Sequence, residues 1–527
     1  MSALSESTLQ PPAGSPVGAG WFAAACKAFA AAVVGAGVGG LAWRVNLGLW
    51  PSVIVALAVF GVGIYAALKL AGSPRELWLT FSVKLATVTA YKLIAVVLVS
   101  FLMKDCGLKD SEAQWVFGIW GVFMSISTLV SGSLTDTLGV RRTLMLGLGI
   151  CLVTRMVMLA SVNPWVVLVC GLIPLGVGEA LCTPVLAAAT RQYTTAAQRS
   201  VAFSVFYAVL NLGFMFAYFV RDGVQSAGDA GGMMALGGVD LSVRRVLILV
   251  SFAMELLAVP VVFWLREPIR EIEAGGGSWI GTVKATAKET GRLFAALFRH
   301  EEFKRLLLFL LLIGLLKIVF NIMDAVLPTF AEREIGAEGA ARVGRLNAVN
   351  SIAIMILAPV VGGLTRKFSA YSMVVFGGML TALSFSFMIV PADWFGGVAE
   401  GWLGQWFGHG YLALTGSVHP YLVMILFWQI AFSVGEAFYS PRVYEYAVSI
   451  APKGQEASYA SLSVVPLLMG KLINSAAFAG LLTAYCPEEG PRNPGMMWTW
   501  IGLLVLLAPV GLLVFRRFIR VKEEGRE

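Results

Sequence analysis

Residues 132–142 read GSLTDTLGVRR and lie between two long apolar runs. This placement predicts a tight loop that joins two membrane-spanning helices. Gly132 and Gly139 permit a sharp turn and a close approach of the helices. Asp136 can pair with an arginine or with a helix N-terminus, and Arg141 and Arg142 mark the cytoplasmic side. We interpret these five residues as a structural and gating motif rather than as ligands of a solute.

The composition of the chain indicates a polytopic membrane protein. Its 527 residues are 58% hydrophobic and 13% charged, with a mean hydropathy of +0.79, whereas soluble domains carry about 25% charged residues. The net charge of +8 comes with no nucleic-acid-binding motif, and the basic residues gather in short loops, where they set topology. We therefore expect a lipid bilayer as surroundings and no nucleic acid partner.

Cysteines and histidines point to no cofactor and no metal. The six cysteines form no CxxC pair, so we interpret them as small core residues, with a Cys106–Cys486 disulfide as the remaining alternative. The three histidines, at 300, 409 and 419, lie far apart in loops. The N-terminus lacks the pattern of a cleaved signal peptide.

Apolar runs of about 20 residues, the length that crosses a bilayer, occur fourteen times. Twelve of them divide six and six, and two more precede these as an extra N-terminal hairpin. The twelve lie near 79–103, 114–134, 143–161, 165–189, 201–220, 245–265, 305–330, 344–364, 371–391, 421–447, 459–484 and 497–518, and the extra pair near 21–43 and 49–71.

These runs divide the chain into six regions. We predict a polar tail, the hairpin, a six-helix bundle, a basic cytoplasmic linker whose stretch Trp279–Phe298 forms an amphipathic helix on the membrane, a second six-helix bundle and a cytoplasmic tail. Their bounds are 1–20, 21–78, 79–265, 266–304, 305–520 and 521–527. Basic residues in alternate loops place both termini in the cytoplasm, and the 392–420 loop on the other side has no Lys or Arg.

The sequence contains a short internal repeat. Gly132-Ser-Leu-Thr-Asp follows the second span of the first bundle, and Gly362-Gly-Leu-Thr-Arg follows the second span of the second bundle. Repeats of this kind are expected in transporters that are built from two related halves.

Polar side chains inside the spans are functional candidates because they are costly in a bilayer. The span 305–330 carries Lys317, Asn321 and Asp324 on one helical face, either as a cavity lining or as a structural Lys–Asp network. The span 421–447 carries one stripe of Gln429, Ser433, Glu436 and Ser440, in which Glu436 can bind a cation or titrate.

Further candidates lie in other spans. They are Tyr207 and Asn211, with Ser204 on the same face; Asn347 and Asn350, with Ser351; and Tyr91 with Lys92. Lys84 is placed to snorkel to the cytoplasmic interface, Arg155 can pair with Glu179, and Glu255 has no obvious partner.

The loop motif resembles that of Major Facilitator Superfamily transporters, and two further segments resemble the proton-dependent oligopeptide transporter (POT/PTR) branch. Phe206-Tyr-Ala-Val-Leu-Asn-Leu-Gly213 is similar to its FYxxxNxG signature, and Gly435-Glu-Ala-Phe-Tyr-Ser-Pro441 is similar to its tenth-helix segment. The resemblance implies proton-coupled uptake of short peptides, with Glu436 at the peptide's amino end and Tyr207 and Asn211 at the binding region.

Two segments depart from that branch. The region Val83–Tyr91 has no acid where the branch carries ExxER, and Glu179 precedes Pro184 where the branch carries a lysine. Lys92 is then a candidate for the carboxylate of the solute, and Glu179 and Asp324 join Glu436 as proton-coupling candidates.

We therefore predict an all-α major facilitator fold and a monomeric, multi-pass protein of the cell (inner) membrane that moves a small zwitterionic solute by alternating access, coupled to protons. The alternatives are transport of another solute, such as an amino acid, sugar, organic acid or drug, and a solute sensor without transport. No catalytic motif or GxxxxGK[ST] loop appears, so we predict neither an enzyme nor ATP drive.

Overall fold

The computed structural model describes residues 49–227, 233–236, 239–266, 301–336, 338–339, 342–365, 367–449, 480–482, 484–487 and 489–519. Several predicted features lie outside these residues: the span 21–43, most of the span 459–484, the linker helix Trp279–Phe298 and both tails.

The first half of the described chain is a set of long helices. Its elements are α2 (Leu49–Lys69), α3 (Arg75–Lys104), α4 (Asp110–Leu138), α5 (Val140–Ala160), α6 (Pro164–Val166), the π-helical turn η1 (Val167–Leu172), α7 (Ile173–Gln192), α8 (Ala196–Ala227), strands β1 (Met233–Leu236) and β2 (Val239–Ser242), and α9 (Val243–Phe263). The strands form an antiparallel hairpin in which Met233 faces Ser242 and Leu236 faces Val239.

The second half repeats this pattern of long helices. Its elements are α11 (Glu301–Asn321), the π-helical turn η2 (Ile322–Val326), α12 (Leu327–Glu334), α14 (Val343–Leu364), α15 (Ala370–Ser384), α16 (Ser386–Ile389), the 3-10 turn η3 (Ala392–Phe395), α17 (Gly396–Glu400), α18 (Trp402–Gln405), the π-helical turn η4 (Trp406–Tyr411), α19 (Pro420–Ser449), α22 (Pro494–Val514) and α23 (Arg516–Ile519).

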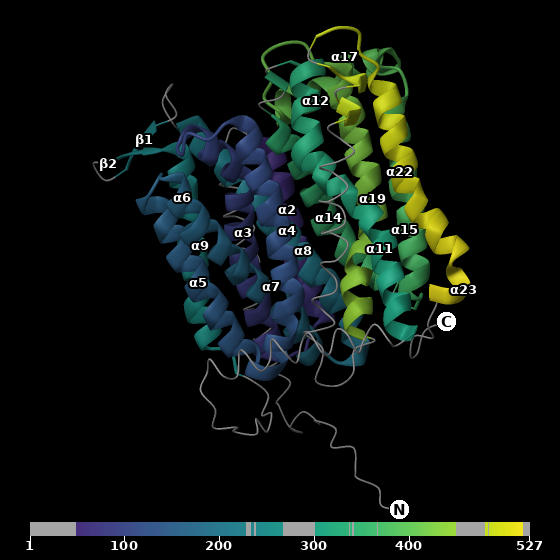
Figure 1. Ribbon diagram of the computed structural model, residues 1–527. Coiled ribbons are helices and arrows are strands. Elements are labelled where there is room, and N and C mark those ends of the chain that lie inside the picture. Colours follow the sequence, from purple (N-terminus) through teal and green to yellow (C-terminus); the bar gives the residue numbers. More distant parts are fainter. Residues whose placement is uncertain are drawn as a thin grey trace, which may run out of the picture.

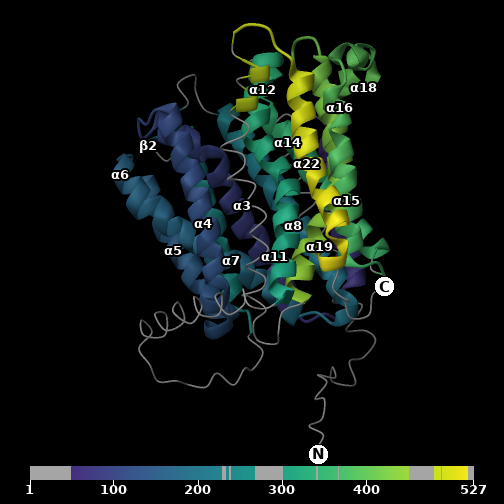
Figure 2. The same cartoon turned by 45° about the vertical axis from the view of Figure 1, so that its right-hand side comes forward.

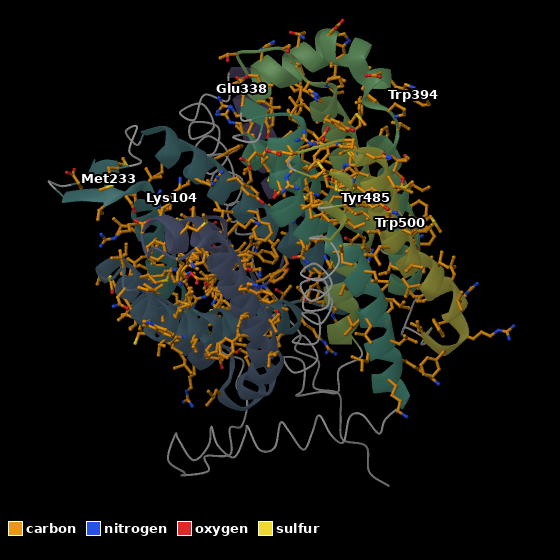
Figure 3. The ribbon with its side chains drawn as sticks, turned by 45° about the horizontal axis from the view of Figure 1, so that its top comes forward. Lys104, Met233, Glu338, Trp394, Tyr485 and Trp500 are labelled. Carbon is orange, nitrogen blue, oxygen red and sulfur yellow. The ribbon has the colours of Figure 1, made fainter. Side chains whose placement is uncertain are left out.

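The helices stand side by side in two groups, purple to teal for the first half and green to yellow for the second (Figure 1). The turned view shows the same division, with the helices of both groups running along one axis (Figure 2). We call the end with the turn at Gly139 the Gly139 end, and the end with α17 and α18 the Trp402 end. Figure 3 tilts the Trp402 end toward the viewer, with Met233 and Lys104 on one half and Glu338 and Trp394 on the other.

The two halves use the same helix pairings. In the first, α3 packs on α9, α5 on α7 and on α9, and α4 on α7. In the second, α11 packs on α22, α15 on α19 and on α22, and α14 on α19. The internal repeat predicted from the sequence is therefore a repeat of structure, and GSLT and GGLT lie near the ends of the equivalent helices α4 and α14.

Glycine pairs allow the same close approach in each half. A Cβ at Gly147 of α5 would lie 3.0 Å from the carbonyl oxygen of Gly178 in α7. In the second half, a Cβ at Gly377 of α15 would lie 2.5 Å from the carbonyl oxygen of Gly435 in α19. Backbones can approach this closely only where side chains are absent. The residue after each of these α7 and α19 glycines is a buried glutamate, Glu179 or Glu436.

The loop motif is tighter than its sequence suggests. Helix α4 continues through Leu138, and Gly139, with φ +86°, is the single residue between it and α5. A positive φ of this size favours glycine. The expected end of the helix near residue 134 was therefore wrong, because Asp136 and Thr137 extend the helix although they are polar.

The described helices fit a bilayer. Among the described residues, nine helices are long and apolar enough to cross a membrane, and shorter apolar stretches lie at Val59–Lys69, Trp115–Thr128 and Leu307–Asn321. These match the predicted spans except the two outside the described residues. Large apolar side chains such as Val153, Leu257 and Leu507 are more than half exposed, as expected of surfaces that meet lipid. The chain is an integral, multi-pass membrane protein.

The expectation for Lys84 was wrong. Lys84 does not snorkel to an interface: its side chain is buried, and its ammonium lies 4.8 Å from the centre of the Phe206 ring. The interpretation of Cys106 and Cys486 as small core residues is confirmed, since both are free, buried thiols rather than a disulfide, and burial raises the pKa of each to about 11.

Candidate functional site

The carboxyl group of Glu436 lies at the centre of a buried polar cluster. The Tyr207 hydroxyl on α8 donates a hydrogen bond to Oε1, and the Asn350 amide on α14 donates to Oε2 at 2.9 Å. The same amide reaches the Ser433 hydroxyl at 2.9 Å. Glu436 and Ser433 are fully buried in α19. The predicted stripe on this helix is therefore confirmed as a buried face that meets two other helices.

Lys317 on α11 brings a cation to the same cluster. Its ammonium donates to the Ser440 hydroxyl at 2.7 Å and lies within 6 Å of the Phe320, Tyr439 and Tyr207 rings. The Ser440 hydroxyl is in turn 3.5 Å from Oε1 of Glu436. Aromatic faces attract an ammonium when few water molecules are present. One hydroxyl thus separates the positive and the negative group.

Asn347 extends the cluster by one turn toward the Trp402 end. Its amide donates to the Met323 carbonyl oxygen at 2.9 Å, and its carbonyl oxygen accepts from Gln429 at 3.4 Å. Met323 lies in the π-helical turn η2, just before Pro328. Proline has no N–H to donate to residue 324, which favours such a wide turn.

The other predicted residues of these spans lie elsewhere. Asn211 is buried but donates to the Tyr207 carbonyl oxygen of its own helix at 3.0 Å. Asn321 is half-buried at the end of α11. Asp324 lies within the π-helical turn η2, so the α-helical spacing that placed it on one face with Lys317 does not hold there. The side chain of Asp324 lies outside the described residues.

Tyr91 and Lys92 lie on α3 in the first half. The Tyr91 ring stacks on Trp120 of α4, with ring centres 6.4 Å apart. The Lys92 side chain is buried, and its ammonium lies 4.9 Å from the Phe214 ring centre and 5.1 Å from that of Tyr218, both on α8. The lysine beside Glu436 is therefore Lys317 rather than Lys92.

Glu179 belongs to a separate buried cluster in the first half. Arg155 on α5 donates to its Oε1 at 2.7 Å, which confirms the predicted pair. The same guanidinium nitrogen lies 3.5 Å from Oε2 of Glu255 on α9. Glu255 thus has an ionic partner, contrary to the sequence interpretation, which could not see that α5 and α9 are neighbours.

Arg442 joins the two halves near the Gly139 end. It donates to the Ser200 hydroxyl of α8 at 2.6 Å and to the Thr365 hydroxyl, directly after α14, at 2.8 Å. Nearby, a Cβ at Gly362 would lie 1.8 Å from the Ser204 hydroxyl, so α14 and α8 touch there. Sequence reasoning did not single out Arg442 as a site residue, yet its side chain is buried. Its place directly after Pro441, inside a long apolar run, was the available signal.

The gating motif is described only in part. Gly132 and Asp136 lie in α4, and their side-chain surroundings are outside the described residues. Arg141 lies over the Phe263 ring at 5.7 Å, and Arg142 is exposed. No described group of three or more His, Cys, Asp or Glu side chains could hold a metal ion.

The structure has two helix groups with the same helix pairings and a polar cluster to which both groups contribute. This arrangement is typical of a known class of transporters. The Major Facilitator Superfamily matches residues 80–411, which is more than half of the chain. The chain belongs to this superfamily. Members of the superfamily are transporters rather than enzymes. No curated protein matched the sequence.

Solved structures share this major facilitator fold over most of the chain. A POT family transporter in complex with a thioalcohol-conjugated peptide is 17% identical, with a TM-score of 0.59, and the match covers 85% of this chain and 97% of that one. A POT family transporter in complex with 5-aminolevulinic acid is 16% identical, with a TM-score of 0.58, 85% and 97% being covered. A bacterial homologue of the human drug peptide transporters PepT1 and PepT2 is 17% identical, with a TM-score of 0.54, 84% and 98% being covered.

Proposed function

We propose that this protein is a proton-coupled secondary transporter of a small zwitterionic solute of the di- or tripeptide type. The observation that carries the proposal is the Glu436 cluster, which combines a buried carboxylate with the Lys317 ammonium at the contact between the two halves. The peptide-binding proteins among the structures of the same fold support this class of solute.

The cluster suits a zwitterion because each of its charges can be exchanged for a charge of the solute. The amino group of the solute would take the place of the Tyr207 and Asn350 donors at Glu436. Its carboxylate would take the place of the Ser440 hydroxyl at Lys317. Asn347, one turn away, would meet the peptide bond. Tyr91, Lys92, Asn211 and Asn321 remain candidates for the far end of a longer solute.

Proton coupling follows from the same chemistry. A buried carboxylate can take up a proton when its cationic partner leaves, because an unpaired buried charge is costly. Glu436 would therefore alternate between a proton and the amino group of the solute, with Glu179 and Asp324 as further coupling candidates. We also propose insertion in the cell (inner) membrane with both termini cytoplasmic, which makes the Gly139 end the cytoplasmic one, and a monomer as the working unit.

Uptake into liposomes tests the proposal. We expect purified protein to accumulate a mixed dipeptide pool under an inward proton gradient, and Glu436→Gln to abolish this uptake. Glu400→Gln is the matched control, because the same substitution there falls on an exposed side chain. Full gradient-driven uptake by Glu436→Gln would overturn the role of Glu436. Dipeptide binding without flux in correctly inserted wild-type protein would favour a sensor instead.

A further inference from the structure

The segment around Glu179 repeats the segment around Glu436. Residues 178–184 read Gly-Glu-Ala-Leu-Cys-Thr-Pro, and residues 435–441 read Gly-Glu-Ala-Phe-Tyr-Ser-Pro. The two segments lie in the equivalent helices α7 and α19, and each begins at the glycine that contacts the neighbouring helix. Each half therefore carries a buried glutamate at an equivalent place, so the first half has a polar centre of its own.

That centre contains one guanidinium group between two carboxylates. The Nη2 atom of Arg155 lies 2.7 Å from Glu179 and 3.5 Å from Glu255, and all three side chains are at least nine-tenths buried. The closer carboxylate holds the hydrogen bond. Within the described part of the chain, neither oxygen of Glu255 has a hydrogen-bond partner, although both are buried.

Within the described residues, the other charged and titratable groups near Glu255 and Glu179 lie on three helices. Each of the helices α3, α5 and α7 contributes to the electrostatic surroundings of the two carboxylates. The groups are Lys84 on α3, Arg155 and Cys151 on α5, and Glu179 and Cys182 on α7. Of these, Lys84 lies over the Phe206 ring and interacts electrostatically with Glu179. Arg155 donates its short hydrogen bond to Glu179.

We propose that Glu255 is a proton-binding residue of the first half, with Arg155 and Glu179 as its positioning partners. A proton that binds to a Glu255 oxygen converts a carboxylate without a donor into a neutral acid and leaves one Arg155–Glu179 pair behind. Protonation removes the buried negative charge of Glu255, which the 3.5 Å contact with Arg155 compensates only in part. This favours proton binding, because burying an unpaired ion costs several kcal/mol. No other bond forms or breaks in the step.

A chain of hydrogen bonds connects the surroundings of Glu255 to α3, the helix that carries Tyr91 and Lys92. Arg155 donates from Nε to the Ser251 hydroxyl at 2.8 Å, and this hydroxyl donates to the Ala90 carbonyl oxygen at 2.8 Å. When Glu255 is an anion it attracts the guanidinium group, and when it is neutral that attraction ends. The Ser251 bridge passes this change to α3. The link from Glu255 to transport rests on the proposed function, whereas proton binding itself does not.

Difference infrared spectroscopy of the full-length protein in liposomes tests proton binding without any solute. In a Glu436→Gln background, which removes the other carboxyl group that we propose to bind a proton, we expect a carbonyl band of a protonated, buried carboxylic acid. This band should be lost when Glu255→Gln is added and retained when Glu112→Gln, which changes an exposed glutamate, is added. Glu179→Gln should also remove the band, because Arg155 is then free to hold Glu255 as an anion. If the band persists in Glu255→Gln, the proposal is overturned.

Transport separates this proposal from the function on which it rests. In Glu255→Gln we expect solute exchange without a gradient to continue and stimulation by a proton gradient to be lost. Unchanged stimulation would overturn the coupling role of Glu255. If wild type moves no dipeptide at all, the proposed function fails, while the infrared band still decides whether Glu255 binds a proton. Loss of exchange together with an altered melting temperature would indicate that Glu255→Gln does not fold correctly. Ser251→Ala, which keeps all three charges, would then serve as the second variant. We expect it to weaken the stimulation by the proton gradient and to keep the infrared band.

Discussion

Breaking the hydrogen bond between Arg442 and Ser200 should open the Gly139 end of the transporter. The bond joins α19 in the second half to α8 in the first, with Nη1 of Arg442 2.6 Å from the Ser200 hydroxyl. Alternating access requires the halves to separate at each end in turn. This bond exists only while the Gly139 end is closed, so Ser200→Ala removes stabilisation from the closed arrangement alone.

The size of the effect follows from the donor. A hydrogen bond to a charged group contributes about 1.5–3 kcal/mol net. Since about 1.4 kcal/mol corresponds to a tenfold change in an equilibrium constant, Ser200→Ala should raise the ratio of open to closed Gly139 ends about 10- to 150-fold.

The structure also supplies a matched control. Arg442 donates to the Thr365 hydroxyl at 2.8 Å, but both of these residues belong to the second half and move together. Thr365→Val removes a hydrogen bond of the same kind that is present in both arrangements. It should lower the melting temperature while leaving the ratio of open to closed ends nearly unchanged.

Distances between spin labels measure the ratio directly. Arg142 and Lys367 are exposed at the Gly139 end, one in each half, and can be replaced by labelled cysteines after Cys26 and Cys170 are changed to serine. A longer distance should gain population in Ser200→Ala and not in Thr365→Val. Equal shifts in the two variants, or none in Ser200→Ala, would refute the reasoning.

Two further predictions concern stability. Gly362→Ala should lower the melting temperature, because its Cβ would overlap Ser204 of α8. Gly149→Ala, with no atom near its Cβ, should raise the melting temperature slightly, because alanine favours the helix more than glycine does. An unchanged melting temperature in Gly362→Ala would contradict the close contact. Hydrogen bonds from the Thr415 amide and hydroxyl hold the pKa of Glu338 below its ordinary value of 4.5, so this carboxylate adds stability above that pH and loses it as the pH falls through the lowered pKa. Glu338→Gln should therefore melt earlier than wild type at neutral pH, and melting curves should converge in acid; a constant difference would argue against the ionised group.

Much of the fold was predictable because it depends on local patterns. Apolar runs located the spans, and helical spacing gave the stripe from Gln429 to Ser440. Helix ends were less accurate, since polar first turns such as Arg75 and Glu76 belong to the helix but not to the apolar run. This explains the error at Lys84. It lies nine residues after Arg75, or about 14 Å into the helix at about 1.5 Å per residue, too deep to reach the interface.

Apart from the pair of Arg155 with Glu179, the contacts between helices discussed above could not be predicted from one sequence. The sequence made Lys92 a candidate for the carboxylate of the solute. In the structure α3 places Lys92 over rings of α8, and α11 places Lys317 beside the Glu436 cluster. Glu255 had no visible partner because Arg155 lies a hundred residues earlier. In both cases the side-chain chemistry was evident, and the packing of distant helices decided the pairing.

The distribution of charge explains how the halves can separate at low cost. The buried ion pairs of Arg155 with Glu179 and Glu255 lie within the first half, and Lys317 and Glu436 lie together in the second. The described polar contacts between the halves use neutral hydroxyl groups, Tyr207 at Glu436 and Ser200 at Arg442. Separating an ion pair would leave two uncompensated buried charges, at a cost of several kcal/mol each. Exchanging a hydroxyl for water or for a solute costs about 1–3 kcal/mol, a difference that binding of a solute or a proton can offset. The described buried ion pairs thus stay within one half, while the hydroxyl contacts between the halves are easy to break, which is what a transporter that rocks between two arrangements requires.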